Sequence, residues 1–560
     1  MAYAMYNIDQ TDQPEEDESL KLIFLGANHE VTGSRTLLEW QKGRYAMIDC
    51  GMEQGENIYE NAEMPIPASQ VEYVFVTHAH IDHTGLLPLL YRQGFRGTVY
   101  TTKETANLCA IMLADSAHIQ MSEAEYKSRK AQRAGLPPVE PDYDLEDVNA
   151  LLKLFRPCDY RQPIRVDEGL TVRFTDIGHL LGSAAIELWC TEGEVTKKVV
   201  FSGDVGNYNQ PILNDPQTVE DADYLVVEST YGNRLHEKRQ DPLPMLTSVI
   251  QRTLDRGGNV IIPSFAVGRT QELLYFIREI KQRGLVKGHD GFPVYVDSPL
   301  ANEATAVFLQ CDTACLDPDA RAVMAEGVNP IAFDGLECSV TADESKALNV
   351  NKAPKVIISA SGMCDAGRIR HHLKYNLWRP ECTILFVGYQ SNGTLGRAIY
   401  EGAKTVKLFG DEIAVEAEVA LLAGVSGHAD RDGIINWVSR FEQTPAHIFV
   451  NHGEDDACMA LVQSLTEKFG VTVESPYSGS EYDLLKDEWT IEAAPIRYKR
   501  EKKQQPKQTS KKTGENKAYD SLMDAARRLL EAAQRYKDMD PREMQSITDK
   551  LNHMISEMKN

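Results

Sequence analysis

The stretch YVFVTHAHIDHTG, from Tyr73 to Gly85, joins an apolar run to a cluster of histidines and an aspartate. Alternating hydrophobic residues in its first half predict a strand. Packing does not explain the second half. At strand-like spacing His78 and His80 project to one side, and Asp82 and His83 follow one turn later, where we expect a helix to begin. Zinc prefers imidazole nitrogen and carboxylate oxygen, so this cluster indicates a metal site at a strand end, although a single histidine is more often structural.

Three further polar residues follow strand-like runs farther along the chain. His179 stands in DIGHLLGS, Asp204 in VVFSGDVG and His452 in FVNHGE. Each alone could be a turn residue that is hydrogen-bonded to the backbone. Together with the first cluster they make seven candidate ligands, which is enough for two metal ions that share a bridging carboxylate.

Length and composition restrict the class of protein. A chain of 560 residues is too long to fold around a single hydrophobic core, since single domains usually stop growing near roughly 250–300 residues. No run approaches the ~18 apolar residues of a membrane span, and the polar N-terminus does not resemble a signal peptide. We therefore expect a cytoplasmic protein without a membrane partner, with its ten scattered cysteines as free thiols. The net charge of −24 argues against indiscriminate nucleic-acid binding, so such a role needs local positive charge from metal or from a basic patch.

The order of strand and helix signals predicts the organisation of the chain. Short strand-like runs begin near Leu20, with a long helical stretch between about 103 and 155. Strands and helices alternate from Asp223 onward, which is typical of a parallel α/β domain. Strand and turn signals after Thr405 indicate a return to the first domain. A polar, basic segment and two short amphipathic helical patterns close the chain.

Several motifs together resemble a known family. THAHIDHTG, with Asp49 upstream and His179 and Asp204 downstream, is similar to the metallo-β-lactamase superfamily pattern. VVESTYGNR, PSFAVGRTQE, VDSPLA, SASGMCDAGR, GYQSNGTLGR, SGHAD and VNHGE then resemble the β-CASP branch of nucleic-acid-processing nucleases. Within that branch the chain resembles prokaryotic homologues of the nuclease subunit of the cleavage and polyadenylation specificity factor. The resemblance covers about Leu20 to Pro495.

The resemblance implies the fold of the region that it covers, and the composition and helical pattern of the chain's ends add the tail, the linker and the terminal helices. The expected fold is α/β: a metallo-β-lactamase αβ/βα sandwich with an inserted β-CASP α/β domain and a C-terminal helical extension. We expect the following division: an acidic tail at 1–18, the first part of the metallo-β-lactamase domain at 19–209, the β-CASP domain at 210–404, the returning part at 405–495, a basic linker at 496–516 and a helical hairpin at 517–560.

The resemblance also implies roles for the candidate residues. One Zn²⁺ would be bound by His78, His80 and His179, the other by Asp82, His83 and His452, and Asp204 would bridge the two. Asp49 would support the ligands and the bridging hydroxide from outside the metal shell. In a two-metal hydroxide mechanism, His428 would act as general acid, with Glu228 orienting it and keeping it protonated. Related DNA-processing enzymes carry valine where this chain has His452, which favours RNA as the substrate.

Substrate contacts are predicted from small residues at turns, where backbone N–H groups can approach phosphate. The candidates are Ser361, Gly362, Thr394, Arg397 and Arg269. Glycine-rich turns are also common in any α/β domain, so a purely structural role is the alternative. The terminal helices could form a homodimer contact, dock a protein partner or pack on the chain's own core.

The predicted function is that of a zinc-dependent ribonuclease on single-stranded RNA, acting as an endonuclease, a 5′–3′ exonuclease or both, in RNA processing or decay. Two alternatives differ in class. One is a hydrolase of the same fold that acts on DNA ends or a small ester, and the other is an inactive RNA-binding scaffold. A domain placed over the site favours a polymer, and the full set of expected ligands favours an active enzyme.

Overall fold

The structure, a computed structural model, describes residues 19–55, 57–236, 241–388, 390–391, 393–422 and 426–498. The predicted acidic tail at 1–18, most of the basic linker and the helical hairpin at 517–560 lie outside the described residues. Among the helices that the structure describes, none is long and apolar enough to cross a membrane.

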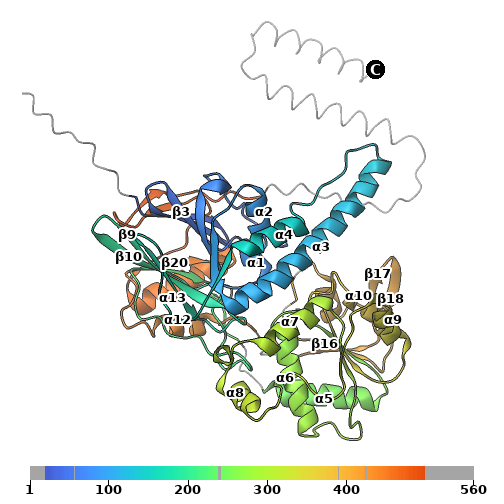
Figure 1. Cartoon of the computed structure of the whole chain (residues 1–560). Coiled ribbons are helices and arrows are strands. Elements are labelled where there is room, and N and C mark those ends of the chain that lie inside the picture. The colour runs from blue at the N-terminus through green and yellow to red at the C-terminus, as the bar shows by residue number, and fades with distance from the viewer. Residues whose placement is uncertain are drawn as a thin grey trace, which may run out of the picture. The chain divides into compact units, whose positions relative to one another are not determined.

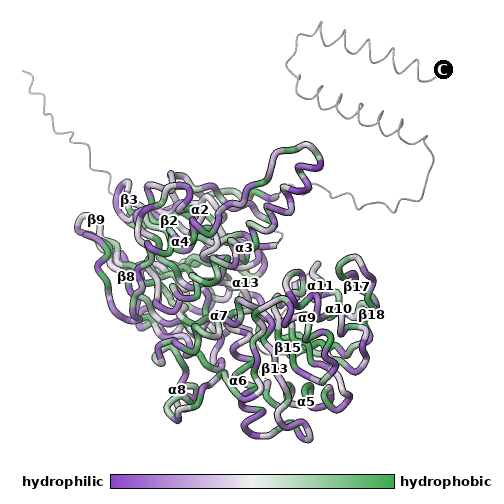
Figure 2. The backbone as a smooth tube through the Cα atoms, turned by 45° about the vertical axis from the view of Figure 1, so that its right-hand side comes forward, coloured by the Kyte–Doolittle hydropathy of each residue, from purple (hydrophilic) through white to green (hydrophobic). Residues whose placement is uncertain are grey.

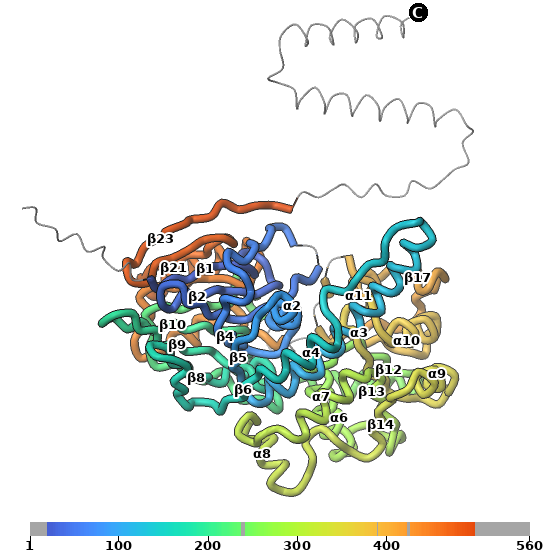
Figure 3. Tube along the Cα trace, turned by 45° about the horizontal axis from the view of Figure 1, so that its top comes forward, coloured from blue at the N-terminus to red at the C-terminus, as the bar shows by residue number. Residues whose placement is uncertain are grey.

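Two sheets pack face to face and form a sandwich (Figure 1). The strands of the first are, in spatial order, β23 (Glu488–Ile491), β22 (Glu481–Asp483), β1 (Lys21–Gly26), β2 (Arg35–Gln41), β3 (Arg44–Ile48), β4 (Val71–Phe75), β5 (Thr98–Thr102) and β6 (Phe155–Cys158). Those of the second are β21 (Thr472–Glu474), β20 (His447–Asn451), β11 (Tyr224–Glu228), β10 (Val195–Phe201), β9 (Ala184–Glu192), β8 (Leu170–Asp176) and β7 (Ile164–Asp167). Late strands thus join both sheets: β22 pairs with the early strand β1, and β20 pairs with β11. Figure 3 shows the late strand β23 at the edge of the first sheet.

Alternating strand residues fill the space between these sheets. Phe24, Phe75, Phe174 and Phe449 belong to one buried cluster that both sheets share. The outer faces are covered by helices: α1 (Ile81–Thr84), α2 (Leu87–Arg92), α3 (Lys103–Arg133) and α4 (Leu145–Leu151) on the first sheet, and α12 (Arg431–Val438) and α13 (Asp455–Phe469) on the second. This arrangement is the αβ/βα sandwich expected from the sequence, which confirms the predicted fold class.

A third sheet is parallel throughout and forms the centre of the inserted domain. Its order is β14 (Leu336–Cys338), β13 (Val294–Val296), β15 (Val356–Ser359), β12 (Val260–Pro263), β16 (Thr383–Phe386) and β19 (Glu418–Leu421). The other elements are α5 (Pro242–Asp255), α6 (Arg269–Gln282), α7 (Pro299–Gln310), α8 (Pro318–Ala325), α9 (Ala342–Val350), α10 (Ile369–Asn376), α11 (Leu395–Tyr400) and the hairpin β17 (Thr405–Leu408) and β18 (Asp411–Ala414). Figure 2 shows hydrophobic colour at β13 and β15 and hydrophilic colour at the far end of α3.

Strand pairing places two elements differently from the predicted domain boundaries. We expected the inserted domain to cover 210–404, but β11 pairs with β10 and β20 of the second sheet. We also expected 405–495 to belong to the sandwich, but β19 pairs with β16 of the third sheet. Both are short apolar strands, and an apolar run does not specify which parallel sheet will accept it, because that choice rests on long-range contacts.

Candidate metal centre

The first histidine cluster is fixed by the backbone around α1. His78 and His80 lie in the turn after β4, and Asp82 and His83 lie on α1 itself. Ser34 N–H donates to the carbonyl of Asp82 at 2.8 Å, and Cys50 N–H donates to that of His83 at 2.7 Å. A β-carbon at Gly51 would lie 1.6 Å from the Asp82 carbonyl oxygen, so only glycine permits this close approach. The cluster is therefore held by chain segments outside its own motif.

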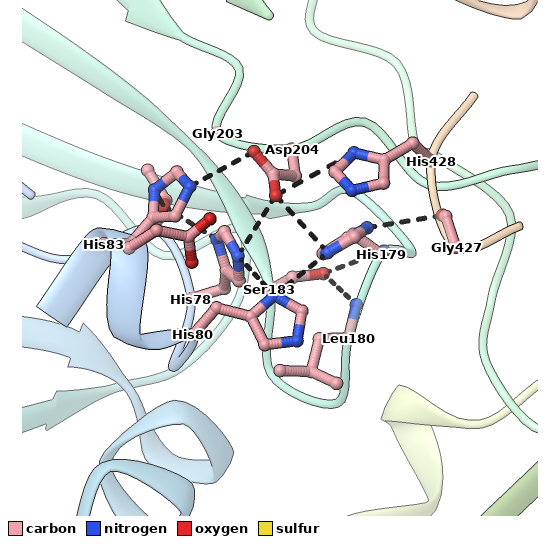
Figure 4. A network of polar contacts seen from close by, with 12 residues as sticks. His78, His80, His83, His179, Leu180, Ser183, Gly203, Asp204, Gly427 and His428 are labelled. Carbon is pink, nitrogen blue, oxygen red and sulfur yellow. Dashed lines mark hydrogen bonds and ion pairs between the residues drawn. The ribbon is translucent and has the colours of Figure 1, made fainter. Parts of the chain in front are cut away.

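His179 is oriented by contacts at both ends of its loop, which follows β8. The Ser183 hydroxyl accepts hydrogen bonds from the N–H groups of His179 and Leu180, at 3.0 and 3.1 Å. The ring Nδ1 of His179 lies 3.3 Å from the Gly427 carbonyl oxygen, which can only accept. Nδ1 therefore carries the proton, and the unprotonated Nε2 faces the centre of the cluster (Figure 4).

Asp204, in the turn after β10, lies at the centre of the histidines. Its carboxylate oxygens lie 3.3 Å from Nε2 of His78, 3.3 Å from Nε2 of His83 and 3.4 Å from Nε2 of His179. His452 follows β20, and its Nδ1 is 3.6 Å from Asp204. Figure 4 shows the labelled histidines converging on this carboxylate. Strand ends far apart in the sequence therefore meet at one point.

The donor atoms form two groups that suit metal ions. His78, His80, His179 and Asp204 offer ligand atoms within 4.8 Å of one another, as do Asp82, His83 and His452. Ring nitrogens also face each other directly, at 3.0 Å for His78 and His80 and at 3.1 Å for His83 and His452. Asp204 Oδ1 is buried and has no hydrogen-bond partner. Ring nitrogens and carboxylate oxygens this close together need a proton or a cation between them, so these residues fit a metal pair.

Charge and burial set the protonation of the ligand candidates. Burial lowers the pKa of His80 to about 3 and, with neighbouring cationic rings, lowers the pKa of His78 and of His179. Neutral imidazole is the form that binds metal. Burial opposes ionisation of Asp204, but His452, His83 and His78 hold its pKa well below the usual range. Burial likewise disfavours protonation of His83, yet Asp204 and Asp49 raise its pKa well above the usual value.

Asp49 contacts the cluster from behind. Its carboxylate lies 2.7 Å from Nδ1 of His83 and accepts hydrogen bonds from the backbone N–H and the hydroxyl of Thr77, at 2.8 and 2.9 Å. Asp49 and His452 both have left-handed backbone conformations, with φ of 56° and 48°. Such conformations are uncommon for these residues and cluster at functional sites. Asp49 therefore orients His83 so that Nε2 faces Asp204.

His428 lies at the open side of the cluster. Its Nδ1 is 3.1 Å from Glu228 and 3.9 Å from Asp204, and its side chain is 22% exposed, whereas that of Asp204 is 2% exposed. The carboxylate of Glu228 also accepts hydrogen bonds from the backbone N–H groups of Val205 at 2.6 Å and Thr230 at 3.1 Å. Burial lowers the basicity of His428, but the carboxylates of Glu228 and Asp204 dominate and raise its pKa to about 10. His428 is thus a partly exposed imidazole beside the candidate metal ligands, and two carboxylates favour its protonated form.

The predicted substrate residues lie in the inserted domain, after the carboxyl ends of its central strands. Ser361 and Gly362 follow β15, and the hydroxyl of Thr394 caps α11 by accepting the Arg397 N–H at 3.1 Å. Arg397 pairs with Glu401 at 2.7 Å, and Arg269, at the start of α6, pairs with Glu272. Both arginines are thus held by a carboxylate of their own helix.

Sequence reasoning missed three residues that support the site. Thr77 holds Asp49 and directly precedes HAHIDH, so its place in that motif was an available signal. The carbonyl of Gly427 orients His179 but belongs to the backbone, which a search for ligand side chains does not detect. His236 places its Nε2 2.9 Å from the carbonyl of His428, and its own N–H donates to Asp430 at 2.9 Å. His236 lies just after VVESTYGNR and 192 positions before His428, so nothing in the sequence indicates their contact.

Comparisons with known proteins agree with this geometry. Residues 31–246 match the metallo-beta-lactamase superfamily, 270–399 the Beta-Casp domain, and 412–476 the Zn-dependent metallo-hydrolase RNA specificity domain. Ribonuclease TTHA0252 of Thermus thermophilus is 35% identical over 79% of this chain and 95% of its own length. Transcription termination factor FttA of Methanosarcina mazei is 32% identical over 81% of this chain and 70% of its own.

A solved structure of a protein of unknown function from Enterococcus faecalis has a TM-score of 0.47 at 12% identity, and covers 83% of this chain and all of its own. That likeness is too low to support an argument. The family assignment rests on the three matching domains and on Ribonuclease TTHA0252, of whose length the match covers 95%. This chain belongs to the β-CASP family of metallo-β-lactamase-fold, metal-dependent ribonucleases.

Proposed function

We propose that this chain is a zinc-dependent ribonuclease that binds two Zn²⁺ and hydrolyses phosphodiester bonds of single-stranded RNA, as an endonuclease, a 5′–3′ exonuclease or both. The observation that carries the proposal is the sharing of one carboxylate, Asp204, by two groups of buried ligands, with a protonated histidine at their open side. The match to an RNA specificity domain and the ribonuclease named among the relatives support RNA as the substrate. A cytoplasmic location is part of the same proposal.

The donor set suits zinc. His78, His80 and His179 would hold one ion, Asp82, His83 and His452 would hold the other, and Asp204 would contact both. Imidazole and carboxylate ligands of this kind are typical of zinc sites. A bound metal pair supplies Lewis acidity, which lowers the pKa of water toward neutrality and stabilises negative charge on a phosphate.

The chain's own residues prepare the ligands for that role. Asp49 accepts the Nδ1 proton of His83, and the Gly427 carbonyl accepts that of His179. In the neutral ring each contact holds the proton on Nδ1 and leaves Nε2 aimed at Asp204. The rings of His78, His83, His179 and His452 are almost completely buried, so bulk water does not compete for their nitrogens, and His80 is partly buried. The contacts of His179 therefore favour the tautomer that binds metal, whereas His83, whose pKa the carboxylates raise, would release its second proton when metal binds.

His428 is placed to supply a proton to the leaving oxygen. The carboxylate of Glu228 keeps the imidazole protonated and fixes Nδ1, which leaves Nε2 as the donating atom. Of the histidines that lie near Asp204, His428 has the most exposed side chain, at 22% against 4% or less for the others, and it lies outside both ligand groups. We assign it as the general acid, and we assign Ser361, Gly362, Thr394, Arg397 and Arg269 as contacts to the RNA backbone.

The test combines zinc content with cleavage of end-labelled single-stranded RNA by the parent protein and His428→Ala. The parent should bind close to two zinc ions and cut RNA. The variant should keep its zinc and lose about 10²- to 10⁴-fold in rate, the usual contribution of a general acid. Internal fragments would identify endonuclease action, and mononucleotides released from the 5′ end would identify exonuclease action.

A control variant, His289→Ala, removes a histidine that pairs with Asp255 in the inserted domain. It should leave cleavage unchanged. Intact RNA in the presence of full metal would contradict the ribonuclease proposal for that substrate. Loss of zinc in His428→Ala would instead contradict the division of roles between His428 and the ligands.

A further inference from the structure

One exposed aromatic ring stands where the inserted domain meets the metal centre. Phe265 follows β12, and it is 52% exposed although its neighbours Ser264, Ala266 and Val267 are buried. Exposed single hydrophobic residues are ordinary on a protein surface, so exposure alone does not indicate a binding role for Phe265. The contacts around this ring do.

The loop that carries Phe265 contacts the segment of the metal ligand His179. A β-carbon at Gly268 would lie 3.2 Å from Cδ1 of Leu180, the residue that follows His179. Leu180, Ala266 and Val267 also belong to one buried cluster. The loop after β12 is therefore packed directly against the metal-ligand loop, and Phe265 is three residues from that contact.

The loop is held in place by the first turn of α6. The hydroxyl of Thr270 donates to the Phe265 carbonyl at 2.7 Å, and the Gln271 side-chain amide donates to the Ala266 carbonyl at 3.2 Å. Gln271 also accepts the Gly268 N–H at 2.7 Å. The exposure of Phe265 is therefore built into an ordered loop, and a ring that is fixed in advance loses little freedom when it binds a ligand.

The ring lies beside one of the predicted substrate residues. A β-carbon at Gly362 would lie 3.3 Å from both Cδ2 and Cε2 of Phe265, so a side chain at 362 would crowd the ring. The Gln390 side-chain amide donates to the Gly362 carbonyl at 3.2 Å, and Gly396 N–H donates to the Met363 carbonyl at 3.0 Å. The loops after β12, β15 and β16 thus meet around Phe265, at the carboxyl edge of the parallel sheet, where α/β domains commonly bind ligands.

We propose that Phe265 is a nucleobase-binding residue, on which one base of the RNA strand stacks while the neighbouring phosphodiester bond lies at the metal centre. This inference rests on the proposed ribonuclease function and adds a base-binding subsite to it. Stacking suits a nuclease of broad sequence range, because every base has an aromatic face and no base-edge hydrogen bond is required. It also suits an acidic protein, because stacking does not depend on net positive charge.

The test compares binding and cleavage of a short single-stranded RNA by the parent, Phe265→Ala and Phe265→Trp. Phe265→Ala should bind the RNA roughly five- to a hundredfold more weakly and show a matching rise in KM, with zinc content unchanged. Phe265→Trp should restore binding, because tryptophan keeps an aromatic face. Phe409→Ala is the matched control: Phe409 is 47% exposed in the same domain but lies in the β17–β18 hairpin, and its loss should leave binding unchanged.

A scan of RNAs that each lack one base separates stacking from a structural role. For the parent, removal of the base at one position near the cut should weaken binding as much as Phe265→Ala does. For Phe265→Ala, removal of that base should cost nothing more. Two outcomes would overturn the proposal. In one, Phe265→Ala binds more weakly than the parent by the same factor on intact RNA and on RNA that lacks the base. In the other, no missing base weakens binding by the parent. If the parent bound RNA in this base-dependent way without cleaving it, the ribonuclease function would fail and the stacking site would stand.

Discussion

Histidines of one cluster take different roles because different groups face their ring nitrogens. His179 faces a backbone carbonyl, other imidazoles and Asp204, and burial with the neighbouring imidazoles outweighs that carboxylate and lowers its pKa well below the usual value. His428 faces two carboxylates, Glu228 and Asp204, which outweigh burial and raise its pKa to about 10. The same side chain is thereby suited to bind metal in one place and to donate a proton in the other.

The pH dependence of Glu228→Gln tests this difference. A general acid works only while protonated, so activity should fall as pH rises through the pKa of His428. Removal of the Glu228 charge should lower that pKa, because Gln keeps the shape but not the attraction for the imidazolium. The alkaline limb of kcat/KM should therefore move to lower pH, by about one unit or more. The measurement is a pH–rate profile of the zinc-loaded proteins.

The matched control for this profile is Glu220→Gln, since Glu220 has a 69% exposed side chain. That variant should keep the parent's alkaline limb. An unshifted limb in Glu228→Gln, with zinc content equal to that of the parent, would remove Glu228 as the group that keeps His428 protonated.

At the scale of elements, the sequence specified where strands end but not which strands pair. Buried apolar runs before HAHIDH, before Asp204 and before His452 correspond to β4, β10 and β20. The αβ/βα class was implied by the family resemblance of these motifs and is confirmed. The sheet membership of β11 and β19 did not follow, because parallel pairing is decided by contacts between residues distant in sequence.

The fine geometry of the candidate site also exceeded what the sequence could show. Residue types and strand-end positions indicated seven ligands, but the tautomers depend on acceptors brought by other elements. The Gly427 carbonyl reaches His179 across 248 positions, and Asp49 reaches His83 across 34. A backbone carbonyl leaves no residue-type signal, so contacts of this kind become visible only in the folded chain.

A buried lysine at the start of β15 offers a test of stability at the same scale. Lys355 is fully buried and donates to the carbonyl of Asn351, and burial, with Arg379 nearby, lowers its pKa to about 8. At neutral pH the ammonium group is charged although it is buried, and this burial of charge costs the folded state free energy. Lys355→Met should therefore stabilise the protein at pH 7, by roughly 3 kcal/mol at most, the cost equivalent to the lowered pKa.

The sign with pH follows from the two protonation states. Below pH 8 the folded and unfolded chains both carry the proton, and the folded state bears the whole penalty. Between about pH 8 and the ordinary lysine pKa of 10.5, the folded chain is neutral while the unfolded chain still binds the proton, so stability rises with pH. Thermal melts should show a large gap between Lys355→Met and the parent at pH 7 that narrows by pH 9.5. A constant gap would mean that packing, and not charge, separates the two proteins.

At the scale of the whole molecule, charge and metal are linked. The chain carries a net charge of −24, yet the family to which it belongs acts on RNA, itself a polyanion. Two Zn²⁺ would add four positive charges at the place where Asp49, Asp82, Asp204 and Glu228 gather. The metal pair would therefore neutralise these four carboxylates, and the imidazolium of His428 would leave the local charge positive where phosphate must approach.

Metal removal should consequently weaken the fold as a whole. The candidate ligands come from the turn after β4, from α1 and from the turns after β8, β10 and β20, so a bound metal pair would tie both sheets of the sandwich together. A ligand that binds only the folded state stabilises it by about 2.7 kcal/mol at a hundred times its Kd. Dialysis against a chelator should lower the melting temperature by several degrees, and zinc should restore it. His452→Ala, which removes one ligand of the second group, should show a smaller response to zinc than the parent, whereas His289→Ala should respond fully. Equal melting temperatures with and without zinc would show that the ligand cluster folds without help from metal, and would leave the ions a purely chemical role.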